Sequence, residues 1–387
     1  MQKIKKQQNL FLKSGGCMEE NYEQQILDWF EDFHANPEVS FREFRTTNKI
    51  AEILEPLEVA YRRFPDITGL IADIGEGGET AAVRADLDAL WQEVDGVFRA
   101  NHSCGHDAHI SMVLGALLYV KNQPLPPNKR IRFIFQPAEE KGNGSLAMIE
   151  RGALEKVTHL FGVHLRPVEE LPFGKFAPSI HHGAGIFLEG KIFGTDAHGA
   201  RPHEGKSAID VIAALYQFIK TLSFPPFESY SVKFTKIAAG SDNLNIIPGT
   251  AEFGLDIRAQ KNHILNRIKE KMEEGLSGLK TLFGVDIQWE WTDYTPGAEV
   301  SKEAVAIAEQ AICRIAGPDA LDAPVITPGC DDFHFYTIKK PEVKASMIGI
   351  GADLKPGLHH PHMHFNRSVL DTGARILADA LLRASSS

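Results

Sequence analysis

Cysteine is scarce in this chain, and it has no long apolar stretch. The four cysteines, Cys17, Cys104, Cys313 and Cys330, are too few and too widely spaced for a disulfide framework. No apolar run approaches the length of a membrane span, and residues 1–17 lack the apolar core of a signal peptide. These absences predict a protein of a reducing compartment, which we expect to be the cytoplasm, with no membrane partner.

The chain also lacks runs of like charge. Asp and Glu number 51 against 41 Lys and Arg, so the formal net charge is −10. A chain with this acidic balance and no basic cluster is not expected to bind nucleic acid. With 43% hydrophobic and 24% charged residues among 387, the composition is that of a globular protein with enough chain for two domains.

Strands and helices are expected to alternate along the first 183 residues. Short apolar segments at 79–85, 130–136 and 158–163 have the character of strands, and helical spacing of apolar residues separates them. This alternation predicts an α/β fold with a mostly parallel sheet and helices on both faces. Ligands bind such sheets beyond the carboxyl ends of the strands.

The pattern changes after residue 183. The elements expected between residues 184 and 296 follow the order β-α-β-β-α-β of a ferredoxin-like domain. A helix at 301–315 and a strand at 343–350 then return to the first pattern. The expected divisions are a disordered leader at 1–18, a first catalytic part at 19–183, an inserted domain at 184–296 and a second catalytic part at 297–387.

The segment 101–109 carries three histidines, a cysteine and an aspartate, and leads directly into a helix. Cys104 and His106 are therefore expected at the helix N-terminus, where the helix dipole favours a thiolate. A buried cysteine beside capping groups is the alternative for an isolated Cys-x-His pair. The choice depends on partners elsewhere in the chain.

Reactive side chains also follow the other expected strands. Asp88 comes after the first strand, Glu139 and Glu140 after the second, and His164 after the third, while a histidine-rich run occupies 358–364. Because these strand ends meet at one edge of the sheet, a mixed cluster of thiol, imidazole and carboxylate is expected. Such a set suits divalent zinc, manganese or cobalt, with room for two ions.

The adjacent Glu139 and Glu140 are the most informative pair, because like charges placed side by side cost free energy. One of them is expected to bind metal, while its neighbour takes a proton from metal-activated water and returns it to a leaving group. An exposed acidic pair is the alternative. For the histidine-rich run, the alternative is a solvated loop with adventitious metal affinity.

Motifs along nearly the whole chain match one known family. They are NPEVSF at 36–41, RADLDAL at 84–90, CGHDAH at 104–109, QPAEE at 136–140, GVH at 162–164, AHGARPH at 197–203, NIIP at 245–248 and LHHP at 358–361. The chain resembles the binuclear metallo-amidohydrolases and peptidases that include hippurate hydrolase, N-acyl-amino-acid amidohydrolase, aminobenzoyl-glutamate hydrolase and indoleacetyl-amino-acid hydrolase.

The resemblance implies a metal-binding set and a catalytic base. The implied ligands are Cys104, His106, Glu140, His164 and His359. Glu139 would act as general base and then general acid, and Asp88 would be a carboxylate that orients a ligand.

The resemblance also implies that the inserted domain is a lid, which in many relatives mediates dimerisation. His198 matches a lid histidine that stabilises the tetrahedral oxyanion, in some relatives from the partner subunit. Asn245 and Arg258 match positions that contact the substrate carbonyl and carboxylate, and the planar guanidinium suits a carboxylate. An ion pair with a neighbouring acid is the alternative for Arg258.

The sequence therefore predicts a metal-dependent amidohydrolase of small N-acyl amino acids, aromatic acyl groups included. Two divalent ions, Mn²⁺ or Zn²⁺ with Co²⁺ as a further candidate, and a homodimer formed through the lid are expected. A dipeptidase or aminopeptidase on the same scaffold is the nearest alternative. A non-catalytic metal-binding protein and a redox sensor at Cys104 are alternatives from other classes.

Overall fold

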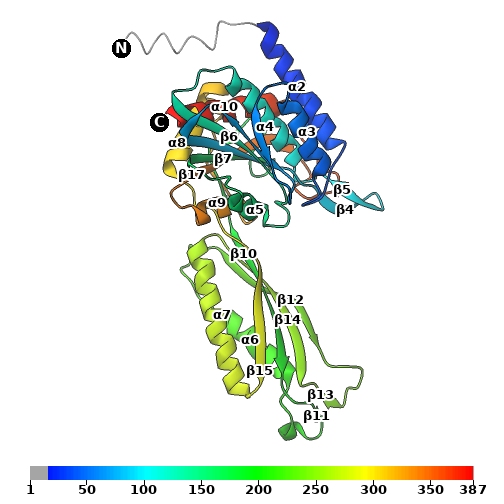
Figure 1. Ribbon diagram of the computed structural model, residues 1–387. Helices are drawn as coiled ribbons and strands as arrows, with labels where there is room; N and C mark the ends of the chain where they lie inside the picture. Colours follow the sequence, from blue (N-terminus) through cyan, green and yellow to red (C-terminus); the bar gives the residue numbers. More distant parts are fainter. Residues whose placement is uncertain (1–15, 387) are drawn as a thin grey trace. The chain divides into compact units, whose positions relative to one another are not determined.

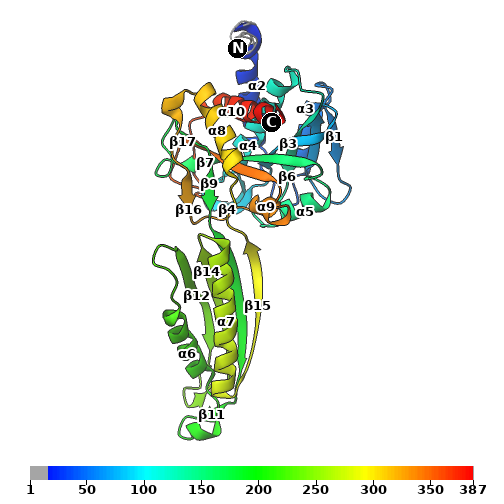
Figure 2. The same ribbon diagram turned by 90° about the vertical axis from the view of Figure 1, so that its left-hand side faces the viewer.

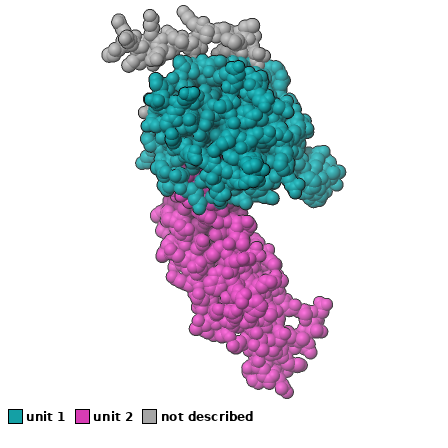
Figure 3. All heavy atoms as spheres, in the orientation of Figure 1, with its two compact units in different colours: residues 1–180, 300–325, 339–387 teal, residues 181–299, 326–338 magenta. Residues whose placement is uncertain are grey.

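The computed structural model describes residues 16–386 and divides the chain into two compact units (Figure 3). Unit 1 comprises the described residues up to Ile180, Val300–Val325 and those from Lys339 onward, and unit 2 comprises His181–Glu299 and Ile326–Ile338. Residues 1–15 of the expected leader lie outside the described residues, and helix α2 (Gly16–His34) begins directly after them. Residues 326–338, assigned above to the second catalytic part, cluster with unit 2.

The main sheet of unit 1 is mixed. Among the described residues its strand order is β1-β2-β6-β3-β7-β17-β8. The bounds are β1 Ala60–Arg63, β2 Leu70–Ile74, β3 Gly77–Asp86, β6 Asn128–Gln136, β7 Val157–Pro167, β8 Phe176–Ala177 and β17 Lys344–Leu354. The central strands β6, β3, β7 and β17 run parallel, whereas β1, β2 and β8 pair antiparallel with their neighbours.

The expectation of a mostly parallel sheet is therefore wrong at the edges. Strands β1 and β8 are only four and two residues long, and β1 reads Ala-Tyr-Arg-Arg, without an apolar run. Such segments lack the periodic signal on which a sequence-based assignment depends. The four strands that were expected from their apolar character form the parallel centre.

Three helices of unit 1 pack together over this sheet: α2, α4 (His106–Lys121) and α10 (Val369–Ser386) (Figure 1). Every side chain of α4 from His106 to Val120 is buried. The helices approach closely at Gly115, where a Cβ atom would lie 2.6 Å from Ile26 of α2 and 2.8 Å from Ala374 of α10. The other helical segments of unit 1 are α3 Phe44–Leu54, α5 Gly144–Glu150, α8 Lys302–Ile315 and the short η2 Pro318–Ala320, whereas the short η1 Pro202–Glu204 and nearly all of α9 His334–Lys339 belong to unit 2.

Unit 2 has the βαββαβ element order expected from the sequence. Its four-stranded antiparallel sheet has the order β12-β14-β10-β15, and helices α6 and α7 cover one face of it (Figure 2). The bounds are β10 Ala184–Phe193, α6 Ala208–Thr221, β12 Tyr230–Ala239, β14 Thr250–Ala259, α7 Asn262–Phe283 and β15 Asp286–Thr295. Apolar side chains from both helices and from the sheet form a second core, separate from that of unit 1.

Short two-stranded ribbons complete the fold. They are β4 (Leu90–Val94) with β5 (Val97–Asn101), β9 (Ile180–His182) with β16 (Val325–Thr327), and β11 (Ala197–His198) with β13 (Ile246–Ile247). None of the helices in the described part of the chain is long and apolar enough to cross a membrane.

Candidate metal centre

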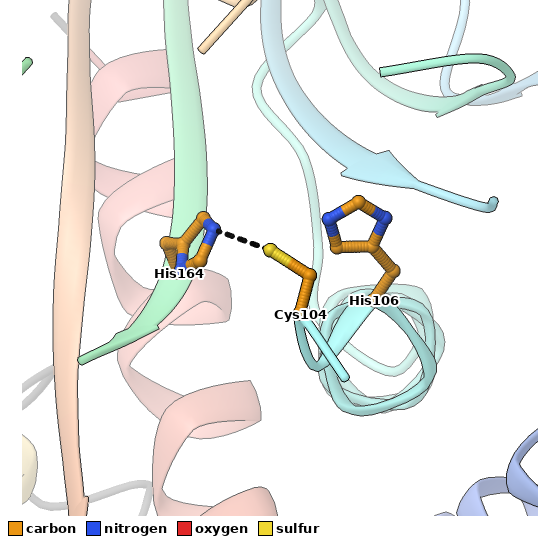
Figure 4. Close-up of side chains that lie close together, drawn as sticks. All are labelled: Cys104, His106 and His164. Atoms are coloured by element: carbon orange, nitrogen blue, oxygen red, sulfur yellow. Dashed lines mark hydrogen bonds between the residues drawn. The ribbon is translucent and has the colours of Figure 1, made fainter. Parts of the chain in front are cut away.

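Cys104 and His106 lie at the start of α4, on either side of Gly105. Gly105 has φ +88°, and a Cβ atom there would lie 2.9 Å from a methyl carbon of Leu165. Only glycine fits this turn without strain. The turn directs Cys104 towards β7, where its Sγ lies 3.6 Å from His164 Nε2, so that Cys104 sits between His106 and His164 (Figure 4).

The ring orientation of His106 is set by its Nδ1 atom, which donates a hydrogen bond to the backbone carbonyl of Asp88 at 2.8 Å. In the neutral ring the lone pair is therefore on Nε2, which faces the site and lies 3.9 Å from both Glu139 Oε2 and Glu140 Oε1. Within residues 16–386, neither His106 Nε2 nor Glu140 Oε1 has a hydrogen-bond partner, although both atoms are buried. Buried polar atoms are nearly always paired, so these two atoms, 3.9 Å apart, fit a cation held between them.

Asp88 holds the segment that carries the two glutamates. Its carboxylate accepts the backbone N–H of Glu139 at 3.1 Å and that of Glu140 at 3.0 Å, together with the Ser40 hydroxyl at 2.6 Å. The preceding Ala138 adopts a left-handed conformation with φ +54°. Asp88 thus fixes His106 through its carbonyl and the glutamate pair through its carboxylate.

His359 reaches the same cluster from the histidine-rich loop. Its Nε2 atom lies 3.5 Å from Glu140 Oε1. Its backbone has φ +65° and is held at both sides: its N–H donates to Ser103 O at 2.8 Å, and its carbonyl accepts the Gln92 amide at 3.0 Å. The neighbouring His362 instead faces Asp95, at 3.2 Å.

The predicted ligands therefore come together in unit 1. Three groups that consist only of predicted site residues have ligand atoms within 4.8 Å of one another: Cys104, His106 and His164; Cys104, Glu140 and His359; and His106, Glu139 and Glu140. A thiol, three imidazoles and carboxylates form a donor set of the kind that holds zinc or another first-row divalent ion. Cys104, His106 and Glu140 each belong to two groups, so the cluster is large enough for two ions.

The acidic groups of the cluster favour a positive charge among them. Burial raises the pKa of Glu140 to about 7, with the carboxylates of Asp88 and Asp86 adding to the effect. Burial alone would lower the pKa of His106, but Asp86 and the other acidic groups around it outweigh burial and raise that pKa well above its usual value. A bound cation would supply the positive charge that protons supply in its absence.

The surroundings of Cys104 contradict the expectation that the helix N-terminus makes it a thiolate. Burial, followed by the charge of Glu140, raises the pKa of the Cys104 thiol well above its usual value. The helix N-terminus does not overcome this loss of solvent. Without a cation Cys104 is therefore a thiol, and a metal ion is the partner that would bring it to the thiolate form.

Sequence reasoning assigned no role to two further buried groups beside this cluster, Asp86 and His109. The Asp86 carboxylate pairs with Arg84 and lies 2.7 Å from His109 Nδ1. Arg84 is 1% exposed and donates from Nε to Gln136 at 2.9 Å. The sequence held one signal for Asp86, its spacing from Arg84. The two charged residues lie on the same face of an otherwise apolar strand.

The remaining predicted residues lie in unit 2. His198 lies on β11 and Asn245 directly before β13, where Gly199 N–H donates to Asn245 O at 2.7 Å, and both residues are exposed. Arg258 lies near the far end of β14, and its guanidinium donates to Asp256 at 2.6 Å and to Cys330 Sγ at 3.2 Å. The local ion pair considered for Arg258 is thus present, and unit 2 does not bring Arg258 close to His198.

Known proteins resemble this chain over nearly its whole length. It is 28% identical to N-acetylcysteine deacetylase of Bacillus subtilis, over 92% of this chain and 96% of that protein. It is 29% identical to IAA-amino acid hydrolase ILR1-like 2 of Arabidopsis thaliana, over 92% of this chain and 84% of that protein. A solved Bacillus subtilis protein, described as a dinuclear metal binding peptidase, superposes with a TM-score of 0.81 at 25% identity, covering 95% of this chain and 99% of that one.

The family model for Peptidase family M20/M25/M40 matches residues 82–383, which include every proposed ligand. This match confirms the resemblance drawn from the motifs and the prediction of a hydrolase. The chain belongs to Peptidase family M20/M25/M40.

Proposed function

We propose that this protein is a metal-dependent amidohydrolase that cleaves the amide bond between an acyl group and an amino acid. The observation that carries the proposal is the cluster of Cys104, His106, Glu140, His164 and His359, in which Cys104, His106 and His164 are buried, with Glu139 beside it. The names of two relatives, an N-acetylcysteine deacetylase and an IAA-amino acid hydrolase, support an N-acyl amino acid as the substrate.

The five ligands would hold two divalent cations, Mn²⁺ or Zn²⁺, with Co²⁺ as an alternative. Bound there, the cations would polarise the substrate carbonyl and lower the pKa of an attacking water. His106 and His164 are already oriented as ligands, because each donates its Nδ1 hydrogen to a backbone carbonyl, at 2.8 and 2.6 Å. This arrangement leaves Nε2 as the ligand atom in both rings.

Glu139 is the proposed general base. Its backbone is held by Asp88, and its Oε2 atom lies 3.9 Å from His106 Nε2, at the edge of the metal cluster. In this position its carboxylate would accept a proton from the attacking water and then deliver it to the departing amine. Such proton transfer contributes roughly 10²- to 10⁴-fold to a rate.

We propose that unit 2 acts as a lid that supplies His198, Asn245 and Arg258 to the substrate. Within unit 2 these residues cannot serve one site together. Thr250 and Arg258 are eight residue steps apart on β14, roughly 26 Å of extended strand, and Asn245 precedes that strand. His198 and Arg258 of one subunit would therefore serve different sites, with His198 reaching the site of a partner subunit.

A homodimer through unit 2 is part of this proposal. Strand β12 is an edge of the unit 2 sheet, and Ile237 on it is 53% exposed. On the neighbouring helix α6, Ile209 and Tyr216 are 48% and 47% exposed. An unpaired strand edge beside exposed apolar side chains is suited to pairing with a second copy.

We also infer that the protein works in the cytoplasm. Cys104, Cys313 and Cys330 are free cysteines in the described part of the chain. A thiol that serves as a metal ligand must stay reduced, which a reducing compartment ensures.

The second candidate is a peptidase that acts on free dipeptides. It is favoured by the solved relative described as a dinuclear metal binding peptidase. The two functions differ in whether the substrate presents a free amino group.

Release of free amino acid from a substrate panel separates these functions. The panel comprises N-acetyl-, N-benzoyl- and indoleacetyl-amino acids beside unblocked dipeptides, each assayed with added Mn²⁺ and with a chelator. Chelator-sensitive cleavage of the blocked substrates is expected. Cleavage of unblocked dipeptides alone would favour the peptidase, and inactivity of the metal-loaded protein on the whole panel would reject both functions.

A further inference from the structure

We propose that His109 is a positioning residue of the metal centre, which bridges β3 and β7 where their hydrogen bonding stops and thereby sets the spacing of His106 and His164. The inference rests on the metal ligation proposed above. It assigns to His109 a role in metal affinity without making it a ligand.

The two central strands of unit 1 separate at the edge of the site. The ladder between β3 and β7 ends at the pair Arg84 and Gly162. Beyond that point β3 remains paired with β6 as far as Asp86, and β7 remains paired with β17 through Leu165. The backbone N–H of Leu165 therefore has no hydrogen-bond partner on β3, because β3 no longer pairs with β7 at this point.

The His109 ring lies between the two strands here, and both of its nitrogens form hydrogen bonds. The backbone N–H of Leu165 donates to His109 Nε2 at 3.1 Å, and His109 Nδ1 lies 2.7 Å from Asp86 Oδ1. Because a backbone N–H can only donate, Nε2 carries the lone pair and Nδ1 carries the hydrogen that is donated to Asp86. The neutral ring thus replaces the missing hydrogen bonds between the two strands.

The bridge touches the supports of both imidazole ligands. His106 lies three residues before His109 on α4, with ring centroids 5.5 Å apart. On the other side, the His109 and His164 rings lie 4.6 Å apart, and His164 donates from Nδ1 to the carbonyl of Leu165 at 2.6 Å. The backbone N–H and the backbone carbonyl of Leu165 are therefore both hydrogen-bonded to histidines. One of these histidines, His164, is a proposed ligand.

Asp86, His106 and His109 also lie close enough together to hold a cation. The hydrogen bonds argue against His109 as a ligand, because the Nε2 lone pair already accepts the Leu165 N–H and Nδ1 carries a hydrogen. His109 is completely buried, so its hydrogen bonds do not compete with water. His109 therefore contributes to the site by fixing the positions of its neighbours.

Titration of the metal-free protein with Co²⁺ tests this role. Absorbance of the thiolate-to-cobalt charge-transfer band reports binding at Cys104 independently of turnover. His109→Phe keeps an aromatic ring and removes both hydrogen bonds, and we expect it to weaken Co²⁺ binding by about 10- to 100-fold, the usual effect of losing a residue that supports a ligand. His109→Gln, which keeps an acceptor for the Leu165 N–H, is expected to restore part of the affinity.

His159 provides the matched control. It is also buried on β7, where its ring hydrogen-bonds Thr158 at 3.1 Å and Glu303 at 3.3 Å. His159→Phe is expected to lower the melting temperature while leaving the Co²⁺ affinity and spectrum unchanged, because the hydrogen bonds it removes go to Thr158 and Glu303, which are not proposed ligands.

Wild-type affinity and an unchanged cobalt spectrum in His109→Phe would overturn the inference. If that variant does not fold, His109→Gln decides: weaker Co²⁺ binding in a folded protein supports the role, and unchanged binding overturns it. Absence of the cobalt–thiolate band in the wild type would instead reject the proposed metal centre itself.

Discussion

At the scale of single residues, two buried carboxylates hold three consecutive backbone N–H groups of the glutamate segment. Ala138 donates to Glu43 at 2.9 Å, and Glu139 and Glu140 donate to Asp88. This pairing offsets the left-handed turn at Ala138 and places both glutamate side chains beside His106. It gives a physical reason for two adjacent acids in a buried site.

Glu43 leads to a prediction about stability and pH. Burial, with the nearby charge of Asp88, raises the pKa of Glu43 to about 7 in the folded protein, against its ordinary value of 4.5. Between these values the folded state binds more protons than the unfolded state, so this group's contribution to stability is full below pH 4.5 and is lost as the pH rises through 7. The loss amounts to about 3 kcal/mol at most.

Urea unfolding of the metal-free protein at pH 5 and pH 8 checks this prediction. Glu43→Gln keeps an acceptor for the Ala138 N–H but cannot ionise, so its free energy of unfolding is expected to fall less than that of the wild type over this range. Because other titrating groups are common to both proteins, they cancel in the difference. Equal pH dependence in the two proteins would show that Glu43 is not the group responsible.

The sequence predicted which side chains gather at the candidate metal centre better than it predicted the residues that hold them in place. Cys104, Glu140 and His164 were recognisable because thiol, carboxylate and imidazole side chains follow expected strands or begin an expected helix. His109 and Glu43 were not, because their roles depend on where two strands separate and on how a distant turn packs. Those features arise only when the chain is folded.

At the scale of elements, the central strands and the helix after the inserted domain matched the sequence-based expectations to within a few residues, as in α8 (Lys302–Ile315), expected at 301–315. Their apolar periodicity and length make them readable. The hairpin of β4 and β5 was missed because its strands are five residues long and mostly exposed. A strand that does not contribute to a core leaves no apolar pattern in the sequence.

Two helical glycines provide a matched test of element packing. Gly115 lies where α4 contacts α2 and α10, so Gly115→Ala is expected to destabilise unit 1 by about 1 to 3 kcal/mol through overpacking. A Cβ atom at Gly278 on α7 would meet nothing within 4 Å, so Gly278→Ala is expected to stabilise by up to about 1 kcal/mol through helix propensity. Chemical denaturation measures both effects, and a stabilising Gly115→Ala would contradict the described packing.

At the scale of the whole molecule, the chain forms two units with separate cores, and the proposed dimer links copies through unit 2. Ile209→Lys combined with Ile237→Lys is expected to produce a monomer in sedimentation equilibrium, because both side chains lie on the proposed apolar interface. Leu282→Lys is the control, since Leu282 is 76% exposed near the end of α7 and outside that surface. A double variant that sediments like the wild type would exclude this interface.

In the proposed mechanism the adjacent glutamates have different roles: Glu140 would bind metal and Glu139 would move the proton. The most direct test measures metal content and turnover together in Glu139→Gln, with Glu140→Gln as the control, on the best blocked substrate. Glu139→Gln is predicted to keep the metal content of the wild type while kcat falls by about 10²- to 10⁴-fold, and Glu140→Gln is predicted to lose metal. A Glu139→Gln protein that keeps most of its activity, or that loses its metal together with its activity, would show that Glu139 is not the general base.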